Sequence, residues 1–531
     1  MFATLALGLC LQSQDAPLTA AEESAYARTS THAEVLNFLD ALAPLPHAAR
    51  LHVGTMGASE EGRALPLVVV AEPPLEQPRQ LEGDERLVAL VNANIHGGEV
   101  EGKEAVQALL REFAQGEHAH LLEHLVLLFV PIYNADGNDR LARSNRATQN
   151  GPVEGVGERP NANRLDLNRD FIKAESAECA ALLGVMNAWD PHLFMDLHTT
   201  NGSYHGYHLT YSPSLSTNVD PALDAYARQE FLPHVREAMQ REHGLRVFDY
   251  GNFGGEPGAR RWSTYDHRPR FGTNYYGLRN RLAVLSEAYS YVDFETRVVA
   301  TRAFVLEVLG ALALEHERVA LLCAAADAKL RAHPRGVHFG WDSELRGPVE
   351  ADVLVGTVEE IELEGDLGVR RVAGEAFSVE RMGVRDGFVS RARASLPTGW
   401  ALVDPDAPTQ RLLRLHGLDV QVLREPRSLP VRAFLVEEQQ RANRPFQGHR
   451  EIRLRGVWRA EERELPAGTW ILPAAQVRGR VAAQLLHPES EDSLATWNTF
   501  EARTEQSGEH PALELNLVDF DSLRPYLEAP R

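Results

Sequence analysis

Cysteine is scarce in this chain of 531 residues, and that scarcity limits the kinds of site it can build. The three cysteines are Cys10, Cys179 and Cys323. Three cysteines cannot form the disulfide framework of a small secreted domain, nor the cysteine cluster of a structural zinc site. Any metal centre must therefore use histidine and carboxylate ligands. The same scarcity fits reducing and oxidising compartments equally well.

Basic residues are also few, since 54 Lys and Arg face 75 Asp and Glu and give a net charge of -21. This charge repels phosphate backbones and anionic lipid surfaces, so we expect no nucleic-acid partner. Apolar runs long enough for a membrane span are absent, and we expect no such span. Short-period repeats and low-complexity tracts are absent too, which disfavours a solenoid or a disordered tail. The sequence does not indicate an oligomeric state.

The start of the chain is apolar, because residues 2–11 are nearly all apolar or small before the chain turns polar. The segment is similar to a short signal peptide without the usual positive charges in front. We predict a possible signal peptide over residues 1–22 and therefore a secreted or periplasmic protein. If the segment is not a signal peptide, the protein is expected in the cytoplasm.

Short apolar runs alternate with longer amphipathic stretches from about residue 65 to residue 330, which predicts an α/β layer domain. The expected strands are 67–70, 87–92, 125–132, 193–197 and 282–285. The expected helices are 100–113, 174–189, 221–242 and a long one from 294 towards 330. After Pro334 glycine and proline recur between short alternating runs, which indicates β structure. We therefore predict a catalytic domain over residues 23–333 and a β-rich accessory domain of unknown role over 334–531.

Residues 94–99 read Asn-Ile-His-Gly-Gly-Glu and lie where an expected strand gives way to a helix. His96 and Glu99, three residues apart, can point at one metal ion, and the glycines between them keep the approach free of side chains. By itself the pattern is weak, because a helix start with a surface histidine has the same form. His198 strengthens the pattern because it ends another apolar strand, and ligands gather at the carboxyl ends of strands in an open α/β sheet.

Glu287 also ends an apolar strand. An unpaired buried charge there would be costly, so Glu287 is either a general base beside a metal-bound water or a structural glutamate paired with Arg279 or Arg281.

Arginines cluster in the segment between two expected strands. Arg140, Arg143 and Arg146 follow an Asn-x-Asp-Gly turn, and Asp166-Leu167-Asn168-Arg169-Asp170 comes shortly after. Guanidinium groups suit bidentate capture of a carboxylate and stabilisation of an oxyanion. A solvated basic loop is the alternative interpretation.

Taken in order, these motifs over about residues 50–310 resemble the zinc carboxypeptidases related to carboxypeptidase A. The resemblance implies a mixed central sheet flanked by helices, and one zinc ion bound by His96, Glu99 and His198. It implies that Glu287 is the base and proton shuttle, that Arg143 steadies the oxyanion, and that Asn168 and Arg169 grip the substrate carboxylate. It also implies that Asp166 orients the first zinc histidine.

The sequence departs from the family pattern in places. Gly98 stands where animal digestive members have an arginine, and Ala135 replaces a proline of the Asn-Pro-Asp-Gly turn. The family's substrate-capping tyrosine is not identified by spacing, because Tyr265, Tyr275 and Tyr276 all precede Glu287; we slightly favour Tyr275 or Tyr276. His205 and His208 follow His198 closely and suggest either a second metal or, as we prefer, the rim of the site.

The resemblance predicts a metallocarboxypeptidase that hydrolyses the C-terminal bond of peptides with a free carboxylate. One alternative is a zinc amidase acting on cell-wall peptides or N-acyl amino acids, because related scaffolds use the same metal site. Another is a binding module that keeps the fold without the chemistry, although every expected functional residue is present.

Overall fold

The computed structural model describes residues 16–256 and 258–530. Most of the predicted signal segment lies outside these residues, and secretion stays a prediction. The end of that segment packs on the body of the protein. Helix α1 (Ala20–Glu23) carries Glu22, whose carboxylate lies 2.6 Å from the guanidinium of Arg111, and Arg111 also donates to the carbonyl of Pro17.

The central sheet has the order β1-β2-β4-β3-β5-β10-β6-β7. Strands β4, β3, β5 and β10 run parallel, whereas β1, β2 and β6 join the sheet antiparallel. The predicted mixed sheet flanked by helices is confirmed. Its strands are β1 (Leu51–Ala58), β2 (Ala64–Val70), β3 (Leu87–Ala93), β4 (Leu125–Val130), β5 (Leu193–Thr200), β6 (Leu209–Pro213), β7 (Val247–Asp249) and β10 (Leu282–Tyr289).

Helices cover both faces of this sheet because both sets of alternating strand side chains are apolar. Leu87, Ala89 and Val91 of β3 pack with helices α2, α3, α7 and α9, whereas Val88 and Leu90 pack with α5 and α8. The helices are α2 (His32–Ala41), α3 (Glu101–Gln115), α4 (Ala135–Asn138), α5 (Ala177–Trp189), α6 (Pro221–Tyr226), α7 (Leu232–His243), α8 (Gly272–Gly277), α9 (Phe294–Leu314) and α10 (His316–Ala332).

The single long helix predicted from residue 294 towards 330 is wrong, since it is two helices. Glu315 leaves helical geometry at φ -103° and ψ 20° and so ends α9. His316 binds the carbonyl oxygen of Ala313 through Nδ1 at 2.9 Å and satisfies a carbonyl that the helix end leaves free. Apolar spacing alone could not reveal this break.

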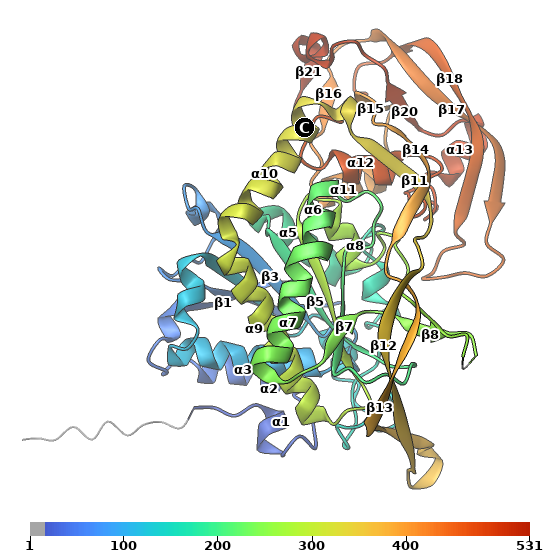
Figure 1. The fold of residues 1–531 in the computed structure, drawn as a ribbon. Helices are drawn as coiled ribbons and strands as arrows, with labels where there is room; N and C mark the ends of the chain where they lie inside the picture. The colour runs from blue at the N-terminus through green and yellow to red at the C-terminus, as the bar shows by residue number, and fades with distance from the viewer. Residues whose placement is uncertain (1–15, 257, 531) are drawn as a thin grey trace, which may run out of the picture.

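The region after α10 is β-rich, as predicted, and Figure 1 shows it above the central sheet. One antiparallel sheet has the order β18-β17-β20-β15-β19-β16-β21, and β11 pairs with β14. Its strands and helices are β11 (His338–Leu345), β14 (Phe388–Ser395), β15 (Gly399–Leu402), α11 (Ala407–Leu415), β16 (Gln421–Leu423), β17 (Arg427–Arg441), β18 (Ile452–Leu465), β19 (Trp470–Pro473), α12 (Gly479–Leu486), α13 (Glu501–Ser507), β20 (Ala512–Leu515) and β21 (Leu527–Glu528).

The two parts of the chain are joined by strand pairing and by a shared core. The long hairpin of β12 (Val349–Glu362) and β13 (Val369–Arg385), which descends beside the central sheet in Figure 1, pairs with β9 (Arg261–Ser263), and β9 pairs with β8 (Asn252–Gly254). One apolar cluster contains Leu183 of α5 together with Leu485 of α12. The β-rich region is therefore packed directly on the α/β part. Among the described residues, no helix combines the length and apolarity needed to cross a membrane.

Candidate metal centre

The loop after β3 is shaped by its own side chains and by close backbone approach. Asn94 adopts a left-handed conformation (φ 62°), and its amide donates to the carbonyls of His96 and Glu99 at 3.2 and 3.1 Å. A Cβ on Gly97 would lie 2.4 Å from the backbone of Gly137, so only glycine fits there. The loop is thus fixed so that the side chains of His96 and Glu99 converge.

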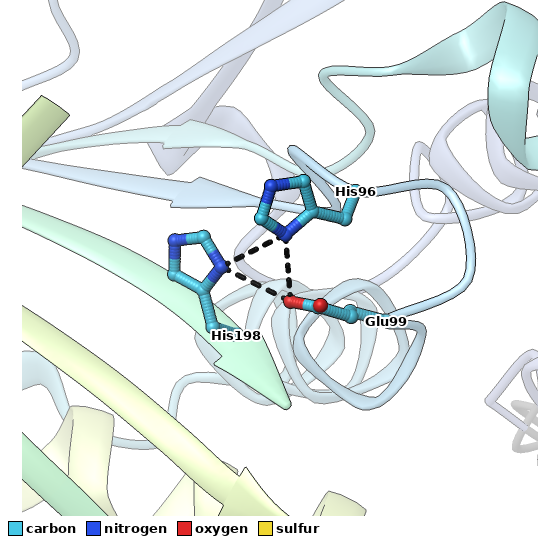
Figure 2. A group of neighbouring side chains, drawn as sticks. All are labelled: His96, Glu99 and His198. Carbon is cyan, nitrogen blue, oxygen red and sulfur yellow. Dashed lines mark hydrogen bonds and ion pairs between the residues drawn. The ribbon is translucent and has the colours of Figure 1, made fainter. Parts of the chain in front are cut away.

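His96, Glu99 and His198 form a triangle of ligand atoms, shown in Figure 2. Glu99 Oε2 lies 3.0 Å from Nδ1 of each histidine, and the two Nδ1 atoms are 3.2 Å apart. All three residues are buried. His198 reaches the triangle from β5, the neighbour of β3, so the parallel pairing of these strands brings the two histidines together.

This donor set fits a zinc ion. Tetrahedral ligation at about 2.0–2.1 Å places neighbouring ligand atoms about 3.3 Å apart, close to the spacing observed here. Two histidines and one carboxylate also leave a fourth position for water or substrate, as in catalytic zinc sites.

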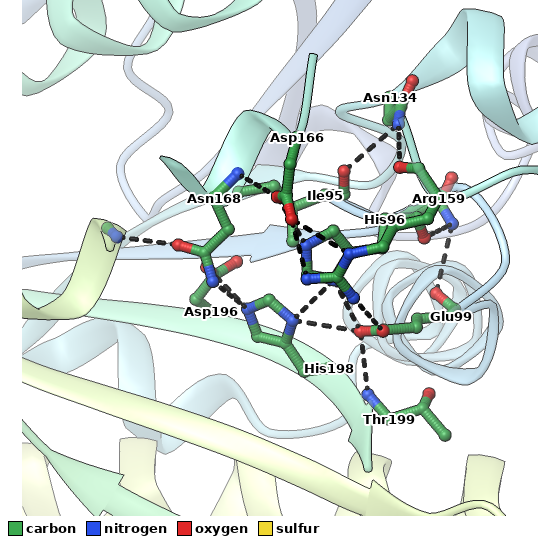
Figure 3. Close-up of polar contacts among 12 residues, drawn as sticks. Ile95, His96, Glu99, Asn134, Arg159, Asp166, Asn168, Asp196, His198 and Thr199 are labelled. Carbon is green, nitrogen blue, oxygen red and sulfur yellow. Dashed lines mark hydrogen bonds and ion pairs between the residues drawn. The ribbon is translucent and has the colours of Figure 1, made fainter. Parts of the chain in front are cut away.

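The outward ring nitrogens of both histidines are held by carboxylates, as Figure 3 shows. His96 Nε2 lies 3.0 Å from Asp166 Oδ1, so the predicted contact of Asp166 with this histidine is confirmed. His198 Nε2 lies 2.9 Å from Asp196 Oδ2, and the amide of Asn92 donates to the other Asp196 oxygen at 2.9 Å. Each carboxylate fixes the tautomer that turns Nδ1 inward and raises its basicity as a ligand. Sequence reasoning missed Asp196, although its place two residues before His198 on one face of a strand was a usable signal.

We expect Asp166→Ala to weaken zinc binding by about 10–100-fold, because His96 would lose the partner that orients its ring. The measurement is zinc titration against a competing chelator. Asp342→Ala, at an aspartate paired with Arg391 on the surface of the β-rich region, is the control and should leave zinc affinity unchanged. Equal zinc affinity in the Asp166 variant and the wild type would contradict the orienting role.

Glu287 lies on β10 opposite His198 in the parallel register with β5. It lines a cavity of about 490 Å³ together with His96, Glu99 and His198. Burial raises the pKa of Glu287 to about 8, partly offset by the charge of His198. Arg279 and Arg281 are bound elsewhere, to Asn187 and to Asp190, and they do not pair with Glu287. The predicted pairing of Glu287 with Arg279 or Arg281 is therefore wrong.

The structure does not bring Arg143 to this cavity. Its side chain is exposed and lines a separate small cavity beside Leu363 and Arg370. Arg146 does reach the metal centre, where it donates to Glu99 Oε1 and to the carbonyl of Thr199, both at 3.0 Å. These two arginines are three positions apart on one loop, and the path of the loop decides which side chain turns inward.

Arg159 is a second arginine at the centre that the sequence reasoning missed. It donates to Asp166 Oδ2 at 2.9 Å and to Glu99 Oε1 at 3.3 Å, and its side chain remains 44% exposed. Burial alone would raise the pKa of Glu99, but the charges of His96 and Arg146 and the hydrogen bonds from both histidines hold this pKa well below its usual value. The position of Arg159 seven residues before Asp166, in the same loop, was the available signal.

Asn168 and Arg169 both line the cavity but differ in how their side chains are engaged. The Asn168 amide lies 3.3 Å from His198 Nε2, and its oxygen accepts from the backbone of Gly272 at 2.8 Å. The Arg169 guanidinium lies 3.9 Å from the ring centroid of Phe271 and forms no ion pair with any carboxylate of the described residues. Burial lowers the pKa of Arg169, and the charge of Asp166 offsets this only in part.

The preference for Tyr275 or Tyr276 as a cap is wrong. Both are fully buried, with their hydroxyls bound to His416 Nδ1 and to the carbonyl of Pro191. They belong to helix α8, which turns them into the core. Tyr265 instead lines the cavity, and so does Tyr250, which precedes it in the chain.

His205 and His208 take no part in a metal cluster among the described residues. His205 is buried against Tyr289, with ring centroids 3.9 Å apart, and its burial lowers its pKa to about 3. His208 Nδ1 accepts from the backbone of Arg246. Both histidines therefore have structural partners beside the site.

Comparison with known proteins finds similarity over the part of the chain that carries this site. Residues 35–229 match the family described as zinc carboxypeptidase. Carboxypeptidase 2 of Trichophyton tonsurans and of Trichophyton equinum are each 27% identical over 144 residues, which is 26% of this chain and 23% of each relative. The chain thus matches about a quarter of the length of these curated relatives.

Solved structures with partial similarity include a metallo-carboxypeptidase from Burkholderia cenocepacia, 17% identical with a TM-score of 0.41 over 54% of this chain and 70% of that one. A metallo-carboxypeptidase from Pseudomonas aeruginosa, solved with (2-guanidinoethylmercapto)succinic acid, is 19% identical with a TM-score of 0.40 over 55% and 70%.

The buried His-Glu-His triangle defines a metal-binding site of the hydrolytic zinc type. The segment that matches the zinc carboxypeptidase family, residues 35–229, contains all three of these ligands.

Proposed function

We propose that this protein is a metallocarboxypeptidase that uses one zinc ion per chain, held by His96, Glu99 and His198, to hydrolyse the C-terminal bond of peptides. We further propose residues 23–333 as its catalytic domain and residues 334–531 as an accessory domain. The single observation that carries the substrate class is Arg169, a cation in the cavity without a carboxylate partner among the described residues.

An arginine without a carboxylate partner among the described residues is unusual in a protein with 75 acidic and 54 basic residues. The neighbouring Arg268 and Arg270 are paired, to Asp266 and Asp492 respectively. A desolvated guanidinium is stabilised by an anion, and its planar fork suits a carboxylate. We infer that the partner of Arg169 is the terminal carboxylate of the substrate, which would set the last peptide bond beside the metal centre.

A zinc ion at this site would lower the pKa of a bound water to about 7 and polarise the scissile carbonyl. Glu287, on the same cavity wall, accepts a proton from the attacking water and passes it to the leaving amine. This transfer requires a carboxylate that can hold a proton near neutral pH, and burial gives Glu287 that property.

Arg159 is our candidate for stabilising the oxyanion in place of Arg143. It also pairs with Asp166 and Glu99, but it borders the cavity and keeps 44% of its side chain exposed, whereas Arg146 is only 17% exposed. A fixed cation facing the developing negative charge is worth more in a cavity than in water.

Tyr265 and Tyr250 line the cavity in which we place the scissile peptide bond. Their rings contact edge to face with centroids 5.5 Å apart, and burial raises the pKa of Tyr250 to about 12. The Tyr250 hydroxyl therefore remains protonated at neutral pH and can donate a hydrogen bond to a bound peptide, whereas the Tyr265 hydroxyl is within hydrogen-bond distance of Thr273 and Asn274.

We expect Arg169→Met to raise KM for peptides with a free C-terminus by about 10–100-fold, because a charge-assisted pair contributes roughly 1.5–3 kcal/mol. Methionine keeps the apolar contact with Phe271. Hydrolysis of a matched series of blocked dipeptides, assayed by amino-acid release, gives kcat and KM. Arg260→Met, which removes an arginine paired with Glu380 outside the cavity, is the control.

An unchanged KM in the Arg169 variant would show that Arg169 does not recognise the substrate carboxylate. If the wild type released amino acids only from muropeptides or N-acyl amino acids, the amidase alternative would replace the peptidase.

A further inference from the structure

The metal-centre cavity is lined by one residue of the β-rich region. Phe446 lies 248 positions after His198, yet it lines the same cavity and is 38% exposed. It belongs to the segment 442–451 that connects β17 to β18, which we name the hairpin tip. The tip turns tightly, with Gln447 at φ 49° and mutual backbone hydrogen bonds between Phe446 and His449.

The hairpin tip is fixed to the catalytic part by polar contacts. Gln447 Oε1 accepts a hydrogen bond from the backbone N–H of Asp166 at 2.8 Å. The side chain of the same Asp166 orients His96. His449 Nε2 lies 2.7 Å from the carboxylate of Glu175. Gln447 and His449 lie on the same turn as Phe446, so their contacts fix the position of the Phe446 ring relative to the metal centre.

A third contact places Phe446 on the Arg169 side of the cavity. The guanidinium of Arg270 lies 5.3 Å from the centroid of the Phe446 ring and pairs with Glu451 of the tip at 2.6 Å. The next residue, Phe271, carries the guanidinium of Arg169 on its ring. Phe446 and Phe271 are thus the aromatic walls near the group that we assign to the substrate carboxylate.

Most other side chains that line this cavity are charged or polar. An exposed phenyl ring in such surroundings loses hydrophobic free energy that an apolar ligand group would recover. Because Arg169 and Phe446 line the same cavity, a carboxylate held by Arg169 would allow the side chain of the same C-terminal residue to reach the Phe446 ring.

We propose that Phe446 determines specificity by contacting the C-terminal side chain of the substrate, so that the β-rich region selects peptides ending in an apolar or aromatic residue. This inference rests on the proposed carboxypeptidase function. The accessory region thereby forms part of the substrate pocket.

The test compares Phe446→Ala, Phe446→Leu and the wild type, as full-length zinc-loaded proteins, on blocked dipeptides ending in Phe, Leu, Ala or Glu. We expect Phe446→Ala to lower kcat/KM for the Phe and Leu substrates about tenfold more than for the Ala substrate, as a lost apolar contact does. Phe446→Leu should keep most of the preference. Phe377→Ala is the matched control, since Phe377 is 41% exposed on β13 and does not line the cavity.

Equal changes on all four substrates in Phe446→Ala, or no change in that variant, would overturn the inference while the proposed function stands. Absence of hydrolysis by the zinc-loaded wild type would overturn the proposed function itself. Thermal unfolding of each variant separates a folding defect from a pocket effect, and Phe446→Gln, which keeps a long side chain but removes the apolar surface, gives the answer if the alanine variant unfolds.

Discussion

Replacing Glu287 by Gln is expected to lower kcat on the order of 10²–10⁴-fold, which is the range that a positioned general base contributes. Gln has nearly the same shape, but it cannot accept the proton of the attacking water or deliver one to the leaving amine. Zinc content should stay at one per chain, because Glu287 is not part of the ligand triangle. KM should change much less than kcat, because the change affects the transition state more than substrate binding.

The control for this prediction is Glu514→Gln. Glu514 is also buried, and burial raises its pKa to about 7, but it pairs with Arg432 in the β-rich region. The same chemical change there should leave kcat unaltered. A Glu287→Gln enzyme with wild-type kcat and full zinc content would show that another group moves the proton.

The strands that carry the site could be predicted because they are strongly apolar and short. Strands β3, β4 and β5 are continuous buried runs, and β10 is buried except at Glu287, which is typical of parallel strands covered on both faces. Strand β1 was missed, because it is an edge strand with alternating partial exposure and two glycines. A recognisable apolar pattern in the sequence reflects the burial of side chains, and an edge strand buries too few side chains to produce one.

Within the site, the metal ligands were the easiest to predict because their chemistry restricts the residue types and strand ends restrict their place. The arginines were harder. Arg143 and Arg159 lie on one long loop, and only the folded path of that loop shows that Arg159 reaches Glu99 whereas Arg143 faces outward. Phe446 could not be found at all, because its approach to the cavity depends on contacts such as that between Gln447 and Asp166, 281 residues apart.

His198→Ala is expected to have an effect at least as large as that of Glu287→Gln. The variant removes one corner of the ligand triangle and leaves only His96 and Glu99 to hold the metal. The loss of zinc affinity should exceed the roughly 10–100-fold that follows from losing an orienting partner. Without the metal, water activation and carbonyl polarisation are lost together, so hydrolysis should fall to background.

The measurements are zinc content after dialysis and amino-acid release, with chelator-treated wild type as reference. Zinc returned to the chelated wild type should restore activity, whereas zinc added to the variant should not. The matched control is His205→Ala, a buried histidine seven residues further along that belongs to no metal cluster of the described chain. Its folded fraction should keep one zinc per chain. Full zinc retention by His198→Ala would mean that the metal binds elsewhere. Because Arg169 and Glu287 share a cavity with the ligand triangle, the proposed placement of the substrate in that cavity would then be wrong as well.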